Sequence, residues 1–359
     1  MNTSQLLDIF MTLVSIDSPT GEENGVAQWI LNRLKDTADI IKEDSYRNIY
    51  VYIKGKGEPR FFSAHMDTVE PGRNIKPIIK GEYITSDGTT ILGGDNKASL
   101  ACMIHTIELL HSQKNTHRPL EFIFTRSEEI GNYGAINFDY SLLKSKTGYC
   151  FDSVMPVGTI VMGSPYYERI NIKLIGKEAH ASQPDDGINT LTLLRHFLEF
   201  QPQGFLNKDT LFNIGIVKGG YVRNSILGDI ELMGEIRSLN EKSLIRFRSL
   251  IETHVKKSIK PFNGRYTFEF VRENSGYLYT NRHVIDEIHS VEKKMRTLSI
   301  VSRETIAWGV SDANIFYEKG LTCINLGDGV ENAHSKEERI KLSELEKMSE
   351  LMISLSSSW

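Results

Sequence analysis

The sequence has few cysteines and no long hydrophobic run, and both absences exclude classes of protein. The three cysteines are an odd number without a Cys-x-x-Cys pair, so we expect reduced thiols rather than a disulfide framework. No apolar run approaches the roughly 20 residues that span a bilayer, and the amino terminus lacks the basic start of a signal peptide. These features predict a cytoplasmic protein with no membrane partner.

The sequence also lacks an excess of positive charge. Its 42 lysines and arginines against 46 aspartates and glutamates give a formal net charge of -4. This balance provides no basic field for a nucleic acid partner. A length of 359 residues exceeds what one ordinary hydrophobic core needs, so we expect two domains.

Alternating helical and strand patterns fill residues 1–165 and return in residues 277–359. Apolar runs at 60–65 and 120–125 are typical of buried strands, and a helical spacing begins near Asp95. Repeated alternation of this kind predicts an α/β sheet that is covered by helices on both faces.

The middle of the sequence, residues 166–276, has a different order of elements. Its strand and helix patterns follow one another as β-α-β-β-α-β, which is typical of a ferredoxin-like α+β unit. The predicted strands cover residues 167–175, 211–217, 229–237 and 265–271. Because the α/β pattern resumes afterwards, we expect this unit to be inserted into the first domain.

A histidine or a carboxylate stands at the end of several predicted strands or in the loop that follows. These residues are His65, Asp95, Glu128, Glu129, Asp152 and His334. In open α/β sheets, ligands bind at the carboxyl ends of the strands, so we expect these side chains to converge. Singly, they have ordinary explanations: a His-x-Asp pair suits a solvated turn, and Asp95 after two glycines suits a helix N-cap.

Together, these residues offer ligands for two adjacent divalent ions and one carboxylate to spare. Mixed histidine and carboxylate ligands suit zinc, and also cobalt or manganese. Two such ions about 3.5–4 Å apart are a hydrolytic arrangement. Glu128 would then be the general base for water, and Asp67 would support the ring of His65.

Six stretches of the sequence together resemble the M20 family of metallopeptidases, most closely its peptidase T (tripeptidase) branch. They are residues 64–69 (AHMDTV), 92–98 (LGGDNKA), 127–131 (SEEIG), 176–182 (GKEAHAS), 309–314 (GVSDAN) and 333–335 (AHS). The resemblance covers nearly the whole chain. It implies a zinc-peptidase-like catalytic domain at 1–165 and 277–359, with a mixed sheet flanked by helices. Residues 166–276 would form the lid and dimerisation domain.

The resemblance also implies a role for each site residue. His65 and Asp152 would bind one ion, Glu129 and His334 would bind the second, and Asp95 would bridge both. Glu128 would be the general base, and Asp67 would support the site. His180 would take part in catalysis, and Asn224 and Arg237 would bind the substrate. One departure from the family pattern is Asn96, because the usual sequence after the glycines is Asp-Asp-Lys. Asparagine keeps the size of the side chain and removes a charge beside the ions.

These inferences predict an aminopeptidase or tripeptidase that hydrolyses short peptides with two divalent ions and forms a homodimer through the lid. Asp152 favours this branch, because the related deacylases and carboxypeptidases often have glutamate there. Two alternatives stay open. One is an N-acyl amino acid deacylase or a carboxypeptidase of the same family. The other is a non-enzymatic metal- or peptide-binding protein, against which Glu128 argues because a binding protein needs no spare carboxylate.

Overall fold

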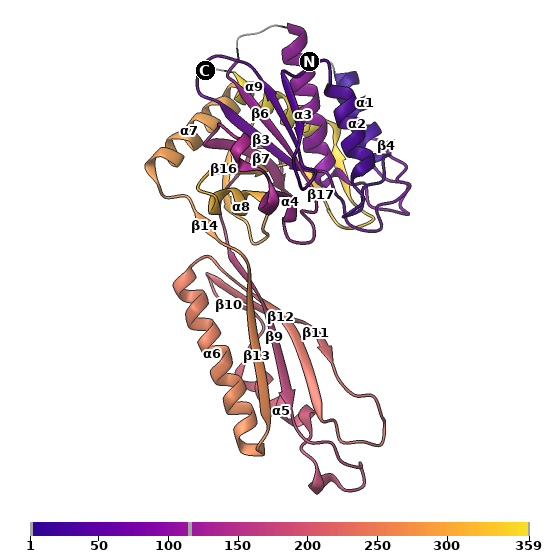
Figure 1. Ribbon diagram of the computed structural model, residues 1–359, viewed down its shortest axis with the longest axis vertical. Helices are drawn as coiled ribbons and strands as arrows, with labels where there is room; N and C mark the ends of the chain where they lie inside the picture. Colours follow the sequence, from indigo (N-terminus) through magenta and orange to yellow (C-terminus); the bar gives the residue numbers. More distant parts are fainter. Residues whose placement is uncertain (1–2, 114–116, 358–359) are drawn as a thin grey trace. The chain divides into compact units, whose positions relative to one another are not determined.

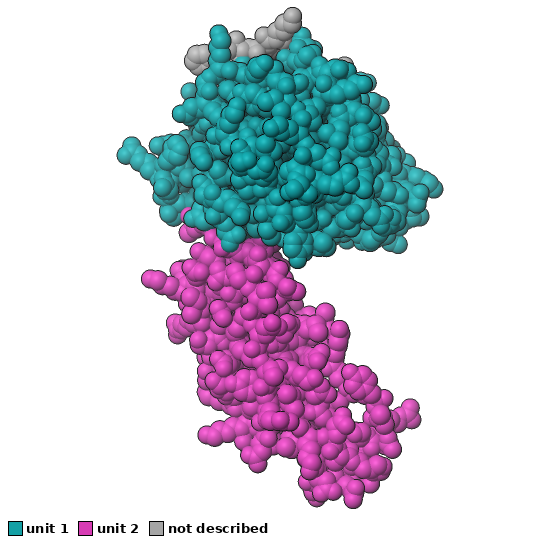
Figure 2. Space-filling view, viewed as in Figure 1, with its two compact units in different colours: residues 1–162, 279–307, 311–359 teal, residues 163–278, 308–310 magenta. Residues whose placement is uncertain are grey.

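The computed structural model describes residues 3–113 and 117–357, which divide between two compact units (Figure 2). Unit 1 comprises Met1–Met162, Tyr279–Ala307 and Ser311–Trp359, and unit 2 comprises Gly163–Leu278 and Trp308–Val310. Among the described residues, no helix combines the length and the apolar composition needed to cross a bilayer.

The short segment Trp308–Val310 was expected in the catalytic domain, but the structure groups it with unit 2. Hydrogen bonds within unit 2 explain this difference. Nη1 of Arg237 donates to the carbonyl oxygen of Trp308 at 2.6 Å, and Oγ of Ser164 donates to that of Gly309 at 2.9 Å.

Unit 1 is built on a mixed sheet. Its strands, in the order in which they pair, are β1 (Ile40–Glu43), β2 (Ile49–Ile53), β6 (Leu120–Thr125), β3 (Arg60–His65), β7 (Thr147–Ser153), β16 (Thr322–Gly327) and β8 (Thr159–Ser164). The strands from β6 to β16 run parallel, and the remaining pairs are antiparallel. The chain leaves unit 1 along β8 and returns after β14 (Tyr277–Leu278), and β15 (Arg303–Ile306) also pairs with β8. This arrangement confirms the predicted α/β class.

The parallel strands of unit 1 are buried because their sequences are apolar. All of β6 is buried, and so is β3 from Phe61 to His65. Strands covered on both faces read as continuous hydrophobic runs rather than as alternating patterns. These buried strands give a fixed sheet edge from which polar residues can project.

Helices pack around this sheet, and α3 (Gly94–Gln113) has a central position (Figure 1). It contacts β3 and β7 and three further helices, which are α1 (Thr3–Val14), α2 (Asn24–Leu34) and α9 (Leu342–Ser356). The other helices are α4 (Tyr133–Asn137), α7 (Arg282–Thr297) and α8 (Asp312–Glu318). A small second sheet has the order β17 (Val330–Glu331), β18 (Arg339–Lys341), β5 (Tyr83–Thr85) and β4 (Ile78–Lys80).

Unit 2 is an antiparallel sheet with helices α5 (Thr190–Phe200) and α6 (Glu241–Ile259) packed against it (Figure 1). The strand order is β10 (Gly204–Asn207), β11 (Thr210–Lys218), β12 (Asp229–Ser238), β9 (Tyr166–Ile175) and β13 (Arg265–Asn274). Alternate residues of β9, namely Ile170, Ile172 and Leu174, lie in the core that the helices cover. The predicted ferredoxin-like order is confirmed, and β10 adds one edge strand to it.

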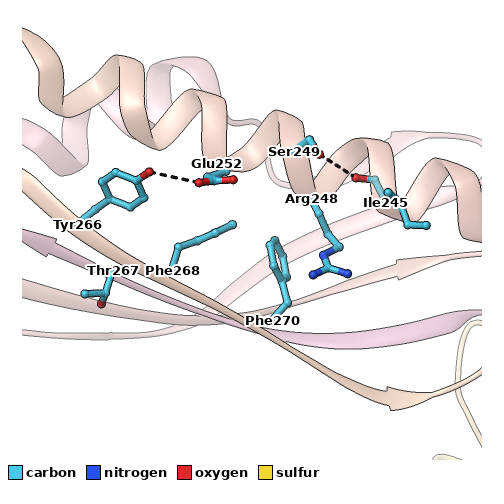
Figure 3. Close-up of a pocket in the computed structure, with 8 residues that line it drawn as sticks. All are labelled: Ile245, Arg248, Ser249, Glu252, Tyr266, Thr267, Phe268 and Phe270. Carbon is cyan, nitrogen blue, oxygen red and sulfur yellow. Dashed lines mark hydrogen bonds between the residues drawn. The ribbon is translucent and has the colours of Figure 1, made fainter.

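An open groove of about 700 Å³ runs between α6 and β13 (Figure 3). Within the described residues, β13 pairs only with β9, so its outer edge remains open. Phe268 and Phe270 line the groove from the strand, and the guanidinium carbon of Arg248 lies 4.6 Å from the Phe270 ring centre. The Tyr266 hydroxyl donates to Glu252 across it at 3.2 Å.

Candidate metal centre and active site

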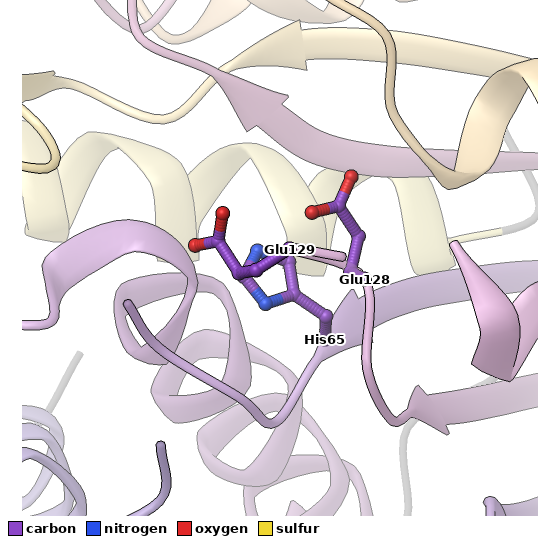
Figure 4. A group of neighbouring side chains, drawn as sticks. All are labelled: His65, Glu128 and Glu129. Atoms are coloured by element: carbon purple, nitrogen blue, oxygen red, sulfur yellow. The ribbon is translucent and has the colours of Figure 1, made fainter. Parts of the chain in front are cut away.

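The order of the parallel strands brings the predicted donor residues to one edge of the unit 1 sheet. His65 ends β3, Glu128 and Glu129 follow β6, and Asp152 lies near the end of β7. Figure 4 shows His65 with the two glutamates beside it. The remaining donors are Asp95, at a non-helical position before the regular turns of α3, and His334, in the loop after β17.

The distances between these donors fall into two groups that share Asp95. Nε2 of His65 lies 3.2 Å from Oδ1 of Asp95 and 3.6 Å from Oδ1 of Asp152. Nε2 of His334 lies 3.4 Å from the other oxygen of Asp95, Oδ2, and 3.2 Å from Oε1 of Glu129. Two atoms about 2.0–2.2 Å from one tetrahedral ion stand about 3.3–3.6 Å apart. Each group is therefore spaced to hold one divalent ion.

The hydrogen bonding of His65 leaves the correct ring nitrogen available. Nδ1 lies 2.9 Å from the backbone carbonyl oxygen of Asp67, which can only accept, so this nitrogen carries the proton. In the neutral ring, Nε2 then presents its lone pair to Asp95 and Asp152. A histidine that is fixed in this way through its second nitrogen is typical of a metal ligand.

The Oε1 atom of Glu129 is buried and accepts no hydrogen bond from the described residues, although His334 is close to it. Buried carboxylate oxygens without a donor are costly. A cation between Glu129 and His334 would satisfy both atoms, so this oxygen fits a metal ligand better than a partner in a hydrogen bond.

Negative charge is crowded around these donors. Burial, with the neighbouring carboxylates, raises the pKa of Glu128 well above its usual range, and burial also raises that of Glu129. Burial raises the pKa of Asp312 to about 7, and that of Asp328 well above its ordinary value. The nearby carboxylate of Asp95, and then that of Glu129, raises the pKa of His334 to about 10. Bound divalent cations would relieve this repulsion.

Asp67 fixes the loop that carries the two glutamates. Its carboxylate, which is fully buried, accepts the backbone N–H of Glu128 at 3.0 Å and that of Glu129 at 3.2 Å. It also accepts the hydroxyl of Thr20 at 2.8 Å. Asp67 therefore orients His65 through its own backbone carbonyl, and it orients Glu128 and Glu129 because its carboxylate binds their backbone N–H groups.

The carboxylate of Glu128 is held by a chain of hydrogen bonds that the sequence analysis missed. Nδ2 of Asn132 donates to Oε1 of Glu128 at 2.8 Å and to Oδ1 of Asp312 at 3.1 Å. The Thr125 hydroxyl donates to the second oxygen of Asp312 at 2.6 Å. Asp312 falls in the family-like stretch 309–314, which was the one signal that pointed to it.

One further carboxylate and one amide hold the segments that carry the donors. Glu338 accepts the backbone N–H groups of Leu92, Gly93 and Asp95 at 2.8–3.0 Å. Asn96 donates to Oδ1 of Asp152 at 2.7 Å, so the residue that departs from the family pattern contacts one donor directly.

Glu23 binds the turn that leads into Glu128. Its carboxylate pairs with Arg126 at 2.5 Å and accepts the backbone N–H of Ser127 at 3.1 Å. Ser127 has a left-handed backbone, with φ of 52°, which costs energy for a residue other than glycine. Glu23 therefore stabilises a strained turn directly before the two glutamates.

We expect Glu23→Gln to lower the free energy of unfolding by about 3–5 kcal/mol, because Arg126 would be left buried without its counter-ion. The matched control is Glu22→Gln, whose exposed side chain pairs with Arg73 on the surface. Urea denaturation followed by circular dichroism measures both. Equal midpoints for the two variants would show that the buried pair does not stabilise the fold.

The remaining predicted residues, His180, Asn224 and Arg237, lie in unit 2. The loops of His180 and Asn224 adjoin, because the Ala181 N–H donates to the Asn224 carbonyl at 2.9 Å. Nδ1 of the exposed His180 accepts the Ser182 N–H at 3.2 Å, so Nε2 carries the proton in the neutral ring. Arg237 is half-buried, and Glu235 pairs with its guanidinium at 3.0 Å.

His180 and Arg237 lie at opposite ends of the unit 2 sheet. Arg237 is opposite Tyr167, at the start of β9, whereas His180 follows the end of that strand at Ile175. Tyr167 and Ile175 are eight residues apart, which in a strand is about 26 Å. The sequence alone did not indicate this separation.

Comparison with known proteins identifies the family. The model of peptidase family M20/M25/M40 matches residues 61–357. The chain belongs to peptidase family M20/M25/M40. It is 31% identical to the uncharacterized protein YqjE of Bacillus subtilis (strain 168), over 99% of this chain and 98% of that protein.

Two solved structures are similar to the chain in both sequence and fold. The aminopeptidase PepT of Bacillus cereus ATCC 10987 is 30% identical, with a TM-score of 0.91, over 99% of this chain and 98% of that one. A tripeptidase of Staphylococcus aureus subsp. aureus Mu50 is 28% identical, with a TM-score of 0.95 and the same coverage. The predicted M20 metallopeptidase of the peptidase T type is therefore confirmed.

Proposed function

We propose that this M20 metallopeptidase is a dinuclear aminopeptidase that releases amino-terminal residues from tripeptides and other short peptides. The observation that carries the proposal is the pair of donor groups that share Asp95, with Glu128 beside them. The names of the two similar solved proteins support the substrate class. The three buried, unpaired cysteines support the cytoplasm as its location.

Each ion has a defined set of residues in this proposal. His65 and Asp152 would hold the first ion, Glu129 and His334 would hold the second, and Asp95 would contribute one oxygen to each. Zinc suits these ligands, and cobalt and manganese are the alternatives. When bound, the ions supply a Lewis acid for the scissile carbonyl and lower the pKa of water.

Glu128 is the general base in this proposal. It takes a proton from the attacking water and passes it to the nitrogen of the leaving amine. Asn132 fixes the direction of its carboxylate through the bond to Oε1. Burial favours proton uptake by Glu128, because it raises the pKa of this carboxyl. Asp67 supplies no proton and acts by holding the histidine and the glutamates in place.

We further propose that unit 2 is a lid that completes the active site of a second copy of the chain. A tripeptide spans at most about 11 Å, which is less than half of the distance along the sheet between the positions of Arg237 and His180. One lid therefore cannot place both residues on the same short substrate. Arg237 of one lid and His180 with Asn224 of a second lid can do so.

The open edge of β13 offers a means of pairing the two lids. Antiparallel pairing of this edge with its copy about a two-fold axis would set the far end of one sheet beside the near end of the other. The groove under α6 and the aromatic residues that line it would be covered in such a dimer. This geometry supports a homodimer in which His180 acts on the peptide held by its partner.

We expect His180→Ala to lower kcat by about 100–1,000-fold with metal content unchanged, because its Nε2–H would stabilise the oxyanion. Coexpression with Glu128→Gln then distinguishes action within one chain from action between chains. If His180 serves the second copy, the coexpressed mixture regains about a quarter of wild-type activity, because half of the dimers are mixed and each mixed dimer has one complete site of two. Absence of recovery in verified mixed dimers would place His180 over its own site.

A substrate panel tests the reaction itself. We expect free tripeptides such as Ala-Ala-Ala to be hydrolysed faster than their N-acetyl forms and faster than N-acetyl amino acids. Detection of the free amino-terminal residue by mass spectrometry identifies the bond that is cleaved. Faster turnover of acylated amino acids would instead support the deacylase, and release of the carboxyl-terminal residue would support the carboxypeptidase. Metal and peptide binding without hydrolysis would support a binding protein.

A further inference from the structure

Arg237 in unit 2 contacts one aromatic ring and the backbone of a second aromatic residue, and the reaction described above does not use these two residues. The guanidinium carbon of Arg237 lies 4.6 Å from the ring centre of Tyr167 on β9. Its Nη1 donates to the carbonyl oxygen of Trp308, and the Trp308 ring lies edge to face with Phe205 at 4.8 Å and 83°. These three aromatic residues thus come from segments far apart in the sequence and are linked to the guanidinium of Arg237, Phe205 through Trp308.

Phe205 is the least buried member of this cluster, with 60% of its surface exposed. It lies on β10, the strand that is added to the ferredoxin-like order, where it pairs with Leu211. A single exposed hydrophobic residue needs no explanation. Phe205 differs because its ring meets the half-buried Trp308, whose carbonyl in turn binds Arg237. Phe205 also pairs with Leu211, which pairs with Arg237, so Phe205 and Arg237 lie on the same face of the sheet, with one strand between them.

The hydrogen bonds of Arg237 leave part of its guanidinium for a ligand. Of its five N–H donors, Glu235 accepts one from Nε at 3.1 Å and one from Nη2 at 3.0 Å. Trp308 accepts one from Nη1. One further N–H remains on each terminal nitrogen, and two such donors match the oxygens of a carboxylate.

We propose that Phe205 and Trp308 form a specificity subsite for the carboxyl-terminal side chain of the peptide. This inference rests on the proposed function, in which Arg237 binds the carboxylate of the substrate. In a peptide, that carboxylate and the last side chain are attached to the same Cα atom. A carboxylate on Arg237 therefore carries the side chain to the aromatic rings, which favours substrates that end in a large apolar residue.

The experiment compares two tripeptides, Ala-Ala-Phe and Ala-Ala-Ser, with metal-loaded enzyme. The wild type is expected to favour Ala-Ala-Phe in kcat/KM, mainly through a lower KM. Phe205→Ala is expected to reduce this preference by about 2–13-fold, which is the factor for an aromatic contact of about 0.5–1.5 kcal/mol. The matched control is Phe200→Ala, because Phe200 is also exposed but lies on α5 near His254 and Lys257.

A second measurement keeps the subsite separate from the proposed reaction. Tryptophan fluorescence should change on titration with Ala-Ala-Phe, and Trp308→Phe should remove that change, although the other two tryptophans remain. Absence of peptide hydrolysis in the wild type would overturn the proposed function, while the fluorescence change would still support a peptide subsite. An unchanged preference in Phe205→Ala, or a fluorescence response that persists in Trp308→Phe, would overturn the subsite.

Discussion

Glu128→Gln is expected to retain both ions and to lower kcat by about 100–10,000-fold, the usual cost of losing a general base. Glutamine preserves the size of the side chain and its acceptor for the Asn132 amide, so the loop should keep its structure. It removes only the capacity to take a proton from water. The measurement is kcat for a free tripeptide, together with metal content by elemental analysis of the same preparation.

The adjacent residue provides a matched control for this prediction. Glu129→Gln makes the same chemical change one position away, but at a donor that faces His334. We expect this variant to lose the second ion, and its activity to recover in part when metal is added in excess. Normal turnover in metal-loaded Glu128→Gln protein would be incompatible with a general-base role for Glu128.

The fold was predictable wherever the hydrophobic pattern had a clear period. The continuous apolar runs of β3 and β6 and the alternation in β9 each specify one type of element. Shorter elements such as β10 and α4 were not expected, because four or five residues are too few to show a period. Tertiary packing, rather than local sequence, determines these short elements.

The convergence of the donor residues could also be inferred, because parallel strands end at the same edge of a sheet. The residues that hold those donors in place through hydrogen bonds could not be inferred from the sequence. Asn132 and Asp312 are 180 positions apart in the sequence and meet only in the folded chain. Glu338 lies in a charged run that reads as solvated surface, yet it is buried and accepts three backbone N–H groups.

In unit 2, the distance between the predicted residues could not be read from the sequence. The resemblance implied that His180 and Arg237 act together from one inserted domain. Their separation depends on the register of β9 and β12, which pairs Arg237 with Tyr167 and Asp229 with Ile175. Matching single residues to a family pattern does not reveal how the strands pair. This separation supports our proposal that unit 2 serves the active site of a second copy.

Asp95→Ala is expected to lose both ions, whereas loss of any other single donor should affect one ion more than the other. The reason is that Oδ1 of Asp95 faces His65 and Oδ2 faces His334, so one carboxylate belongs to both donor groups. Removing it also removes one negative charge from a crowded cluster, and the metal-free protein should keep its fold. Hydrolysis should be lost with the ions.

Thermal unfolding with and without added zinc tests this bridge independently of activity. A ligand that binds only the native state at 100 times its Kd stabilises it by about 2.7 kcal/mol, so zinc should raise the Tm of the wild type. The Tm of Asp95→Ala should not respond at the same zinc concentration. The control is Asp87→Ala. Asp87 lies outside the donor groups and accepts a hydrogen bond from the Thr89 N–H. The Tm of this variant should respond to zinc as that of the wild type does. Two ions retained per chain in Asp95→Ala would exclude the bridging role, because neither donor group would then depend on the shared carboxylate.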